Sequence, residues 1–425
     1  MKKYLGVIIL FIIVFYTLYP QAISFFGYSF LFTVAAGGLG LYLYQGRPFP
    51  EIMNIALAYF PIVLLSWITV YMTSYSDPYL YDYTKSQIAW LFGSFLVVFL
   101  FFIIHPRGSF ILFLYYIIAA ILAQCIISIA MHQNEAVRNF FNSLQMSDFV
   151  NQIKRDDTEG KRLLGYGVAF FGAGVSCGFA LILIVYIAIK GKFRIIQLAL
   201  LAAVYCIILY VGLLSARTTS IGLFASLILA VILLITGNAP RSQLFKFVAV
   251  GAILASIGST LCYIYFPEFS DWAFEGFINY QKSGKFSTQS SDGLENMFIL
   301  PYTFDQWVYG WGHMEFWGSD VGYTRLLFWI GLPGTIAYFL YQFILMKMSF
   351  TKDQAWVFTL LIAYAYNLAL NVKGLSDLNL FMYFFIFYFL HYKYYIYTPQ
   401  LYRLGKINKN KLHYAVQSKA ANGRI

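Results

Sequence analysis

The chain has 425 residues, of which 60% are hydrophobic and only 11% are charged. Because apolar runs recur along its whole length, a water-soluble domain with one core is excluded and a polytopic membrane protein is favoured. The formal net charge of +11 does not indicate nucleic-acid binding, because the positive residues are spread over short hydrophilic gaps and the C-terminal tail. The four cysteines lie inside apolar runs and are interpreted as small hydrophobic residues: Cys125, Cys177, Cys206 and Cys262.

We expect one all-α membrane domain over residues 1–425, with about twelve transmembrane helices. In chain order the expected spans are 4–19, 24–44, 52–73, 87–104, 109–131, 168–189, 195–214, 218–236, 247–266, 321–346, 355–372 and 377–397. The first follows only Met-Lys-Lys and lacks a small-residue cleavage site, so we interpret it as an anchor rather than a signal peptide.

The distribution of charge predicts that both termini are cytoplasmic. With that orientation, the cytoplasmic segments contain 18 of the 29 lysines and arginines, and 16 of the 18 acidic residues face outward. Two extracytoplasmic loops are then long, 132–167 and 267–320, and the basic tail 398–425 is cytoplasmic. Long loops on one face of a helical scaffold usually carry binding or catalysis, so we expect the functional site outside.

Arg217 lies in a turn of a few residues between two expected spans, in LLSARTTSIGL. The side chain of such an arginine can simply extend to the lipid–water interface. The alternative is a fixed cation for phosphate, since the guanidinium group presents a planar fork of donors. Arg162, at the entry to another span, could face an anionic headgroup in the same way.

The loop 267–320 is rich in aromatic residues, which suit either interfacial helices or a sugar-stacking surface. Asp320 lies where this loop enters the next span. It could cap that helix together with Ser319, or it could accept a proton from a sugar hydroxyl. Arg325 would lie a turn deeper, where an isolated charge is costly, so we expect it to face a cavity or a carboxylate.

The chain resembles the Wzy-type polymerases of bacterial O-antigen and capsular polysaccharide, in the superfamily that also contains the O-antigen ligases. The resemblance rests on SDVGYTRLLFWIGLPG after the YGWG turn, on SARTTSIGL around Arg217, and more weakly on Arg162 with Gly165. It covers roughly residues 160–345. Family members commonly carry a second arginine in the large loop, whereas this chain has no basic residue between Ser287 and Tyr309.

The resemblance implies a glycosyltransferase that moves a growing glycan from its undecaprenyl diphosphate carrier onto a lipid-linked repeat unit. The reaction would take place at the outer face of the bacterial cytoplasmic membrane, without a metal or other cofactor. The implied site has Asp320 and Arg217 as catalytic residues, with Arg162, Arg325, His313 and Glu315 as substrate-binding residues. The implied partners are the lipid-linked donor and acceptor, the bilayer, a flippase and a chain-length regulator, and not nucleic acid.

Three alternatives remain open. An O-antigen ligase would share the fold, although histidine would be expected at position 320. A metal-dependent lipid-sugar transferase would use Asp156, Asp157 and Glu159, which are otherwise explained as part of a charge-balanced solvated segment. A flippase or transporter would place charged residues in the middle of its spans, facing a central cavity.

Overall fold

The structure is a computed structural model that describes residues 2–25, 28–44, 50–75, 79–156, 162–191, 193–285, 288, 293–313 and 319–391. Throughout these ranges the chain is almost entirely helical, which confirms the all-α class. The strands are β1 (Ser24–Phe25) and β2 (Tyr28–Ser29), which pair antiparallel. The helices of the first half are α1 (Lys2–Leu18), α2 (Phe30–Tyr44), α3 (Pro50–Thr73), α4 (Tyr79–Ile104), α5 (Phe110–Gln133), α6 (Glu135–Leu144), α7 (Ser147–Asp156) and α8 (Phe170–Lys190). Those of the second half are α9 (Ile195–Ser215), α10 (Thr219–Ile235), α11 (Arg241–Tyr265), α12 (Pro267–Ala273), α13 (Glu275–Ser283), the 3₁₀ turn η1 (Glu295–Met297), α15 (Phe304–Tyr309), α16 (Gly322–Met348), α17 (Gln354–Leu370) and α18 (Leu380–Leu390).

Seven of these helices are long and apolar enough to cross a membrane: α3, α4, α5, α8, α9, α11 and α16. The chain is therefore a helical membrane protein. Five shorter apolar helices, α1, α2, α10, α17 and α18, occupy the remaining ranges where spans are expected from sequence. Whether these five also cross the membrane stays a prediction.

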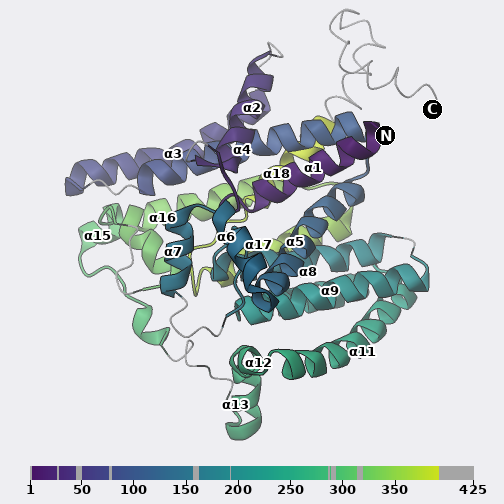
Figure 1. Cartoon of the computed structure of the whole chain (residues 1–425). Helices are drawn as coiled ribbons and strands as arrows, with labels where there is room; N and C mark the ends of the chain where they lie inside the picture. The colour runs from purple at the N-terminus through teal and green to yellow at the C-terminus, as the bar shows by residue number, and fades with distance from the viewer. Residues whose placement is uncertain are drawn as a thin grey trace, which may run out of the picture.

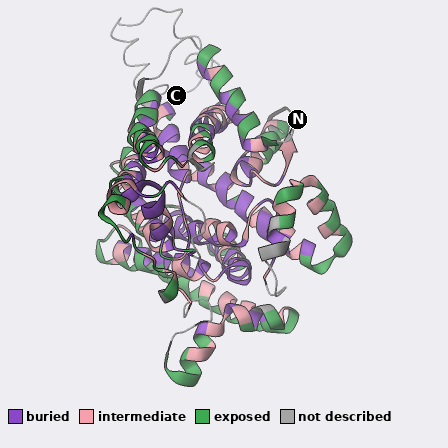
Figure 2. Cartoon of the chain, turned by 90° about the vertical axis from the view of Figure 1, so that its left-hand side faces the viewer, coloured by how far each residue is buried: buried purple, intermediate pink, exposed green. Residues whose placement is uncertain are grey.

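The long helices lie side by side, and the segments between them are unequal in length. The N-terminus and the connection between α8 and α9 lie at the right of Figure 1, whereas α7 and α15 lie at the left. The helices α12 and α13 hang below the bundle (Figure 1), and Figure 2 shows that much of their surface is exposed. In the described parts of the two long loops, the α-helices are short: α6, α7, α12, α13 and α15.

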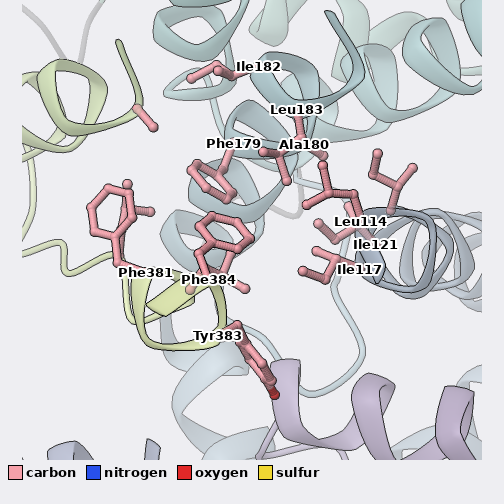
Figure 3. Close-up of a cluster of buried hydrophobic side chains, with 14 of the residues drawn as sticks. Leu114, Ile117, Ile121, Phe179, Ala180, Ile182, Leu183, Phe381, Tyr383 and Phe384 are labelled. Atoms are coloured by element: carbon pink, nitrogen blue, oxygen red, sulfur yellow. The ribbon is translucent and has the colours of Figure 1, made fainter. Parts of the chain in front are cut away.

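The core lies where α5, α8 and α18 meet. Phe179 of α8 packs on Phe384 of α18 with ring centroids 6.1 Å apart, and Leu114 and Ile117 of α5 face the same cluster (Figure 3). All four side chains are fully buried. Lipid tails are as apolar as these side chains, so close van der Waals packing, rather than exclusion of water, holds the helices together.

Helix α16 is broken after about its first third, whereas the expected span 321–346 was continuous. Ile330 and Gly331 leave the helical conformation, and Gly331 has φ of 65°. Pro333 has no N–H for the carbonyl of Trp329, and the break frees the carbonyl of Phe328. The amides of Gly312 and Trp311 donate to these two carbonyls, at 3.2 and 2.6 Å. The loop before α16 thus completes the hydrogen bonding of the interrupted helix.

The break divides α16 into two unequal parts. Residues 331–348 form a rod of about 27 Å, which matches the thickness of a bilayer's hydrocarbon core. The first part, 322–330, then extends beyond that thickness, and Asp320 and Arg325 belong to this end of the helix. One rod is already long enough for a crossing, so the depth of Arg325 in the membrane stays a prediction.

Candidate functional site

Two arginines predicted from the sequence lie together because their backbones are connected. The amide of Leu163 donates to the carbonyl of Leu214 at the end of α9, 3.0 Å away. This bond brings the segment with Arg162 beside the turn 216–218, which carries Arg217. Two backbone hydrogen bonds stabilise this turn: the amide of Thr219 donates to the carbonyl of Ala216, and the amide of Ser220 donates to the carbonyl of Arg217. Arg217 is therefore fixed by backbone structure on both sides, as a tight turn between two helices predicts.

The two guanidinium groups share one aromatic partner, Trp272 of α12. The guanidinium carbon of Arg217 lies 4.4 Å from the centre of its ring, and that of Arg162 lies 5.2 Å away. Arg162 also approaches the ring of Phe170, at the start of α8, at 5.3 Å. The negative face of an aromatic ring attracts cations, so Trp272 holds two like charges near each other that would otherwise repel.

Arg217 makes further contacts with the same outer segment. Its Nε donates to the carbonyl oxygen of Trp272 at 2.9 Å, and its terminal nitrogen forms an ion pair with Glu275 at the start of α13. The Arg217 side chain is only 11% exposed, against 28% for Glu275. The predicted alternative, a side chain that simply extends to the interface, does not describe this arginine.

A third cation, Lys373, belongs to the same neighbourhood. It lies in the connector 371–379 between α17 and α18. Gly322 packs against Gly374 of this connector, and Gly374 packs against Phe171 of α8, so the connector lies between the start of α16 and the start of α8. Burial and the positive charges of Arg217 and Arg162 lower the pKa of Lys373 to about 8, and Asp320 acts in the opposite direction.

The connector is held in place by polar side chains. The side-chain amide of Asn371 donates to the carbonyl of Ser376 at 3.0 Å and accepts from the amide of the same residue at 3.1 Å. The Asp377 carboxylate accepts from the Tyr83 hydroxyl at 2.7 Å and from the Gln87 amide at 3.1 Å, both on α4. These hydrogen bonds fix the backbone of the connector and so the position of Lys373.

Asp320 is exposed and lies two residues before α16. Val321 takes the position that caps this helix, and the Ser319 hydroxyl accepts from the amide of Val321 while donating to the carbonyl of Met297. The predicted alternative role, a helix cap by Ser319 or Asp320, is therefore not what the structure shows. Asp320 is instead close enough to Lys373 to raise its pKa.

The remaining predicted residues have different positions. His313 stacks on Tyr75 at the end of α3, with ring centroids 3.5 Å apart, and Trp311 lies edge-on at 6.2 Å. Arg325 lies in the first turn of α16 and is partly buried. Glu315 lies outside the described residues, as do Asp157 and Glu159 and the side chain of Asp156. No group of three metal-binding side chains occurs in the part of the chain that the structure describes.

The structure thus brings the predicted residues Arg162, Arg217 and Asp320 into one neighbourhood, together with Lys373, Trp272 and Glu275, which were not singled out. Lys373 had a sequence signal. It is a lysine in a short connector that the predicted orientation places outside, which is the same argument that selected Arg217. Trp272 and Glu275 had no such signal, because their part depends on how the long loop folds back onto the turn 216–218.

The charge of the cluster of cations, Arg162, Arg217 and Lys373, should affect how anion binding depends on pH. The pKa of Lys373 is about 8 instead of the ordinary 10.5, so its charge is lost as the pH rises through 8. Affinity for pyrophosphate should fall over that interval in the purified wild-type protein, measured by calorimetric titration. The arginine of Lys373→Arg keeps its charge over this interval, so the affinity of that variant for pyrophosphate should not fall. An identical pH profile in both proteins would contradict the assignment of Lys373 to the anion-binding cluster.

The same lowered pKa predicts an opposite effect on stability. The unfolded chain binds the Lys373 proton more tightly than the folded chain does. The charged Lys373 therefore lowers the free energy of unfolding, and this penalty has its full size below pH 8. The penalty disappears as the pH rises from 8 towards 10.5. The free energy of unfolding of the ligand-free protein should therefore rise between pH 8 and 10.5, where anion affinity falls. Lys373→Arg should show neither trend.

Comparison with known proteins adds no relative to this geometry: no family model, no curated protein and no solved structure matches the chain.

Proposed function

We propose that the chain is a glycosyltransferase that polymerises lipid-linked repeat units at the outer face of the bacterial cytoplasmic membrane. The observation that carries the proposal is the cluster of three cations, Arg162, Arg217 and Lys373, beside the exposed carboxylate of Asp320. On this proposal the five shorter apolar helices also cross the bilayer, which gives twelve spans, and both termini are cytoplasmic. The resemblance in sequence to the Wzy-type polymerases supports the same assignment.

The cations suit a diphosphate leaving group. Arginine forks match phosphate oxygens, and a partly buried cluster acts on charge more strongly than cations in water do. As the bond between the donor's anomeric carbon and the diphosphate oxygen breaks, the electron pair leaves with the diphosphate. Preorganised cations stabilise the negative charge that develops there. Arg162, Arg217 and Lys373 would perform this task for the undecaprenyl diphosphate carrier.

Asp320 would act on the acceptor. A hydroxyl oxygen of the incoming lipid-linked unit forms the new bond to the anomeric carbon, and its proton passes to the carboxylate of Asp320 and then to solvent. Exposure of Asp320 leaves room for a sugar above the start of α16. Aromatic side chains exposed on the same loop, including Tyr280, Tyr302 and Phe304, offer stacking surfaces for the glycan.

The proposal is tested by glycan chain length in a deletion strain of the native host that expresses Asp320→Asn or Asp156→Asn. We expect Asp320→Asn to leave single repeat units and Asp156→Asn to give normal polymer, at matched abundance in the membrane. Full-length polymer with Asp320→Asn would refute the assigned role of Asp320. Loss of polymer with Asp156→Asn alone would favour a metal-dependent transferase.

A further inference from the structure

The guanidinium group of Arg217 already has an anionic partner in this structure. Its terminal nitrogen pairs with the carboxylate of Glu275, and its Nε donates to the backbone of Trp272. Both partners come from α12 and α13, about 55 residues further along the chain. The group proposed to bind phosphate is therefore occupied by a negative charge from the protein itself.

The segment that supplies this charge is packed against the bundle up to Phe274 and is mostly exposed or half-buried after Gly276. Phe274, between the two helices, packs against Tyr263 of α11 and Tyr210 of α9, at 6.0 and 6.4 Å between ring centroids. After Phe274, α13 carries mostly exposed or half-buried side chains, such as Phe277 and Tyr280. Figure 1 shows α13 projecting below α12, away from the bundle. The Arg217–Glu275 ion pair thus connects the turn 216–218 to α13.

We propose that the carboxylate of Glu275 is an internal counter-anion, which holds the place of the ligand's phosphate group on Arg217 and is exchanged for it when ligand binds. This inference rests on the proposed anion site and adds how that site is occupied before and after binding. The displaced carboxylate returns to solvent, and α13 loses one of its ties to the bundle.

Charge and exposure both favour such an exchange. Three cations held close together repel one another, so a nearby anion stabilises them, and Glu275 provides it. A diphosphate group carries more negative charge than a carboxylate and offers more oxygen atoms to the guanidinium donors. Glu275 is more exposed than Arg217, so its carboxylate recovers hydration when it leaves. The cation stays in position while the anion changes.

The test uses the full-length protein in detergent, with pyrophosphate as the probe. Glu275→Gln removes the charge of the internal anion. Glu268→Gln, on the exposed surface of α12, removes the same charge from the neighbouring helix and is the matched control. We expect Glu275→Gln to bind pyrophosphate roughly fivefold more tightly than wild type, the change that corresponds to about 1 kcal/mol for a partly exposed ion pair. Glu268→Gln should bind like wild type.

Amide hydrogen exchange provides a second readout. Pyrophosphate should accelerate exchange in residues 275–283 of the wild-type protein, because it releases Glu275, and should have little further effect on Glu275→Gln. If pyrophosphate binds to wild type but not to Arg217→Ala, while both glutamine variants bind like wild type, the exchange mechanism is refuted and the anion site stands. If Arg217→Ala binds pyrophosphate as wild type does, the proposed anion site fails and the inference fails with it.

Discussion

Arg217→Ala should abolish polymer formation while leaving the protein inserted in the membrane. The substitution removes a cation whose side chain is only 11% exposed, and with it the fork of donors closest to Trp272 and Glu275. Loss of one preorganised group that stabilises transition-state charge typically lowers the rate by about 100- to 1,000-fold. A polymerase slowed to this extent should leave single repeat units, visible as the collapse of the glycan ladder on a gel.

Two further variants separate chemistry from folding. Arg138→Ala, on α6, removes an arginine whose ion pair with Glu135 is largely exposed, so a normal ladder is expected. Arg217→Lys keeps the charge but loses the bidentate geometry, and should give a shortened ladder rather than none. A full glycan ladder with Arg217→Ala would contradict the proposed role of Arg217 in the reaction. An equal loss of the ladder with Arg138→Ala would also contradict it, because the effect would then not be specific to Arg217.

The positions of the helices could be predicted from the sequence because long apolar runs depend only on local composition. Every expected span contains a helix, but several boundaries differ for a physical reason. Helix α4 begins at Tyr79 rather than near 87, because its first turns carry Asp82 and Lys85, which a hydropathy argument excludes although a helix accommodates them at an exposed end. The expected span 24–44 begins with a short strand pair, and its helix starts only at Phe30.

The site was predicted in part, and the limit has a clear cause. Arg162 and Arg217 stood out because charge next to an apolar run is rare, and such signals are local. Their convergence depends on one backbone bond, from Leu163 to Leu214, and on an aromatic ring supplied from a distant loop. Contacts of this kind depend on tertiary structure, so spacing along the chain could not reveal Trp272 or Glu275.

The broken helix connects the two motifs that flank it. The glycines of the YGWG turn and of the IGLPG segment were separate features of the sequence, yet in the structure they touch. A Cβ atom on Gly310 would lie 2.6 Å from the amide nitrogen of Gly331, and one on Gly331 would lie 2.5 Å from the carbonyl oxygen of Val308. The turn therefore determines where the first part of α16, and Asp320 before it, is placed.

Gly310→Ala should consequently destabilise the protein by about 2 to 6 kcal/mol. Gly310 has φ of 74° and ψ of −156°, a backbone region that costs an L-residue about 1 to 3 kcal/mol, and its added methyl group would collide with the backbone of the broken helix. Overpacking of this kind typically adds about 1 to 3 kcal/mol. Because the collision is with backbone atoms, it can be relieved only by moving the turn or the start of α16.

Gly237→Ala is the control for a substitution at positive φ without a collision. Gly237 has a similar φ of 70°, but a Cβ atom there would meet nothing within 4 Å, so only the strain of the left-handed backbone applies. Thermal unfolding in detergent should therefore show a clearly larger loss for Gly310→Ala than for Gly237→Ala. Polymer should shorten only with Gly310→Ala, since the displaced turn moves Asp320 relative to Arg217 and Lys373. Equal losses of stability would mean that the contact between the two motifs does not hold α16 in place.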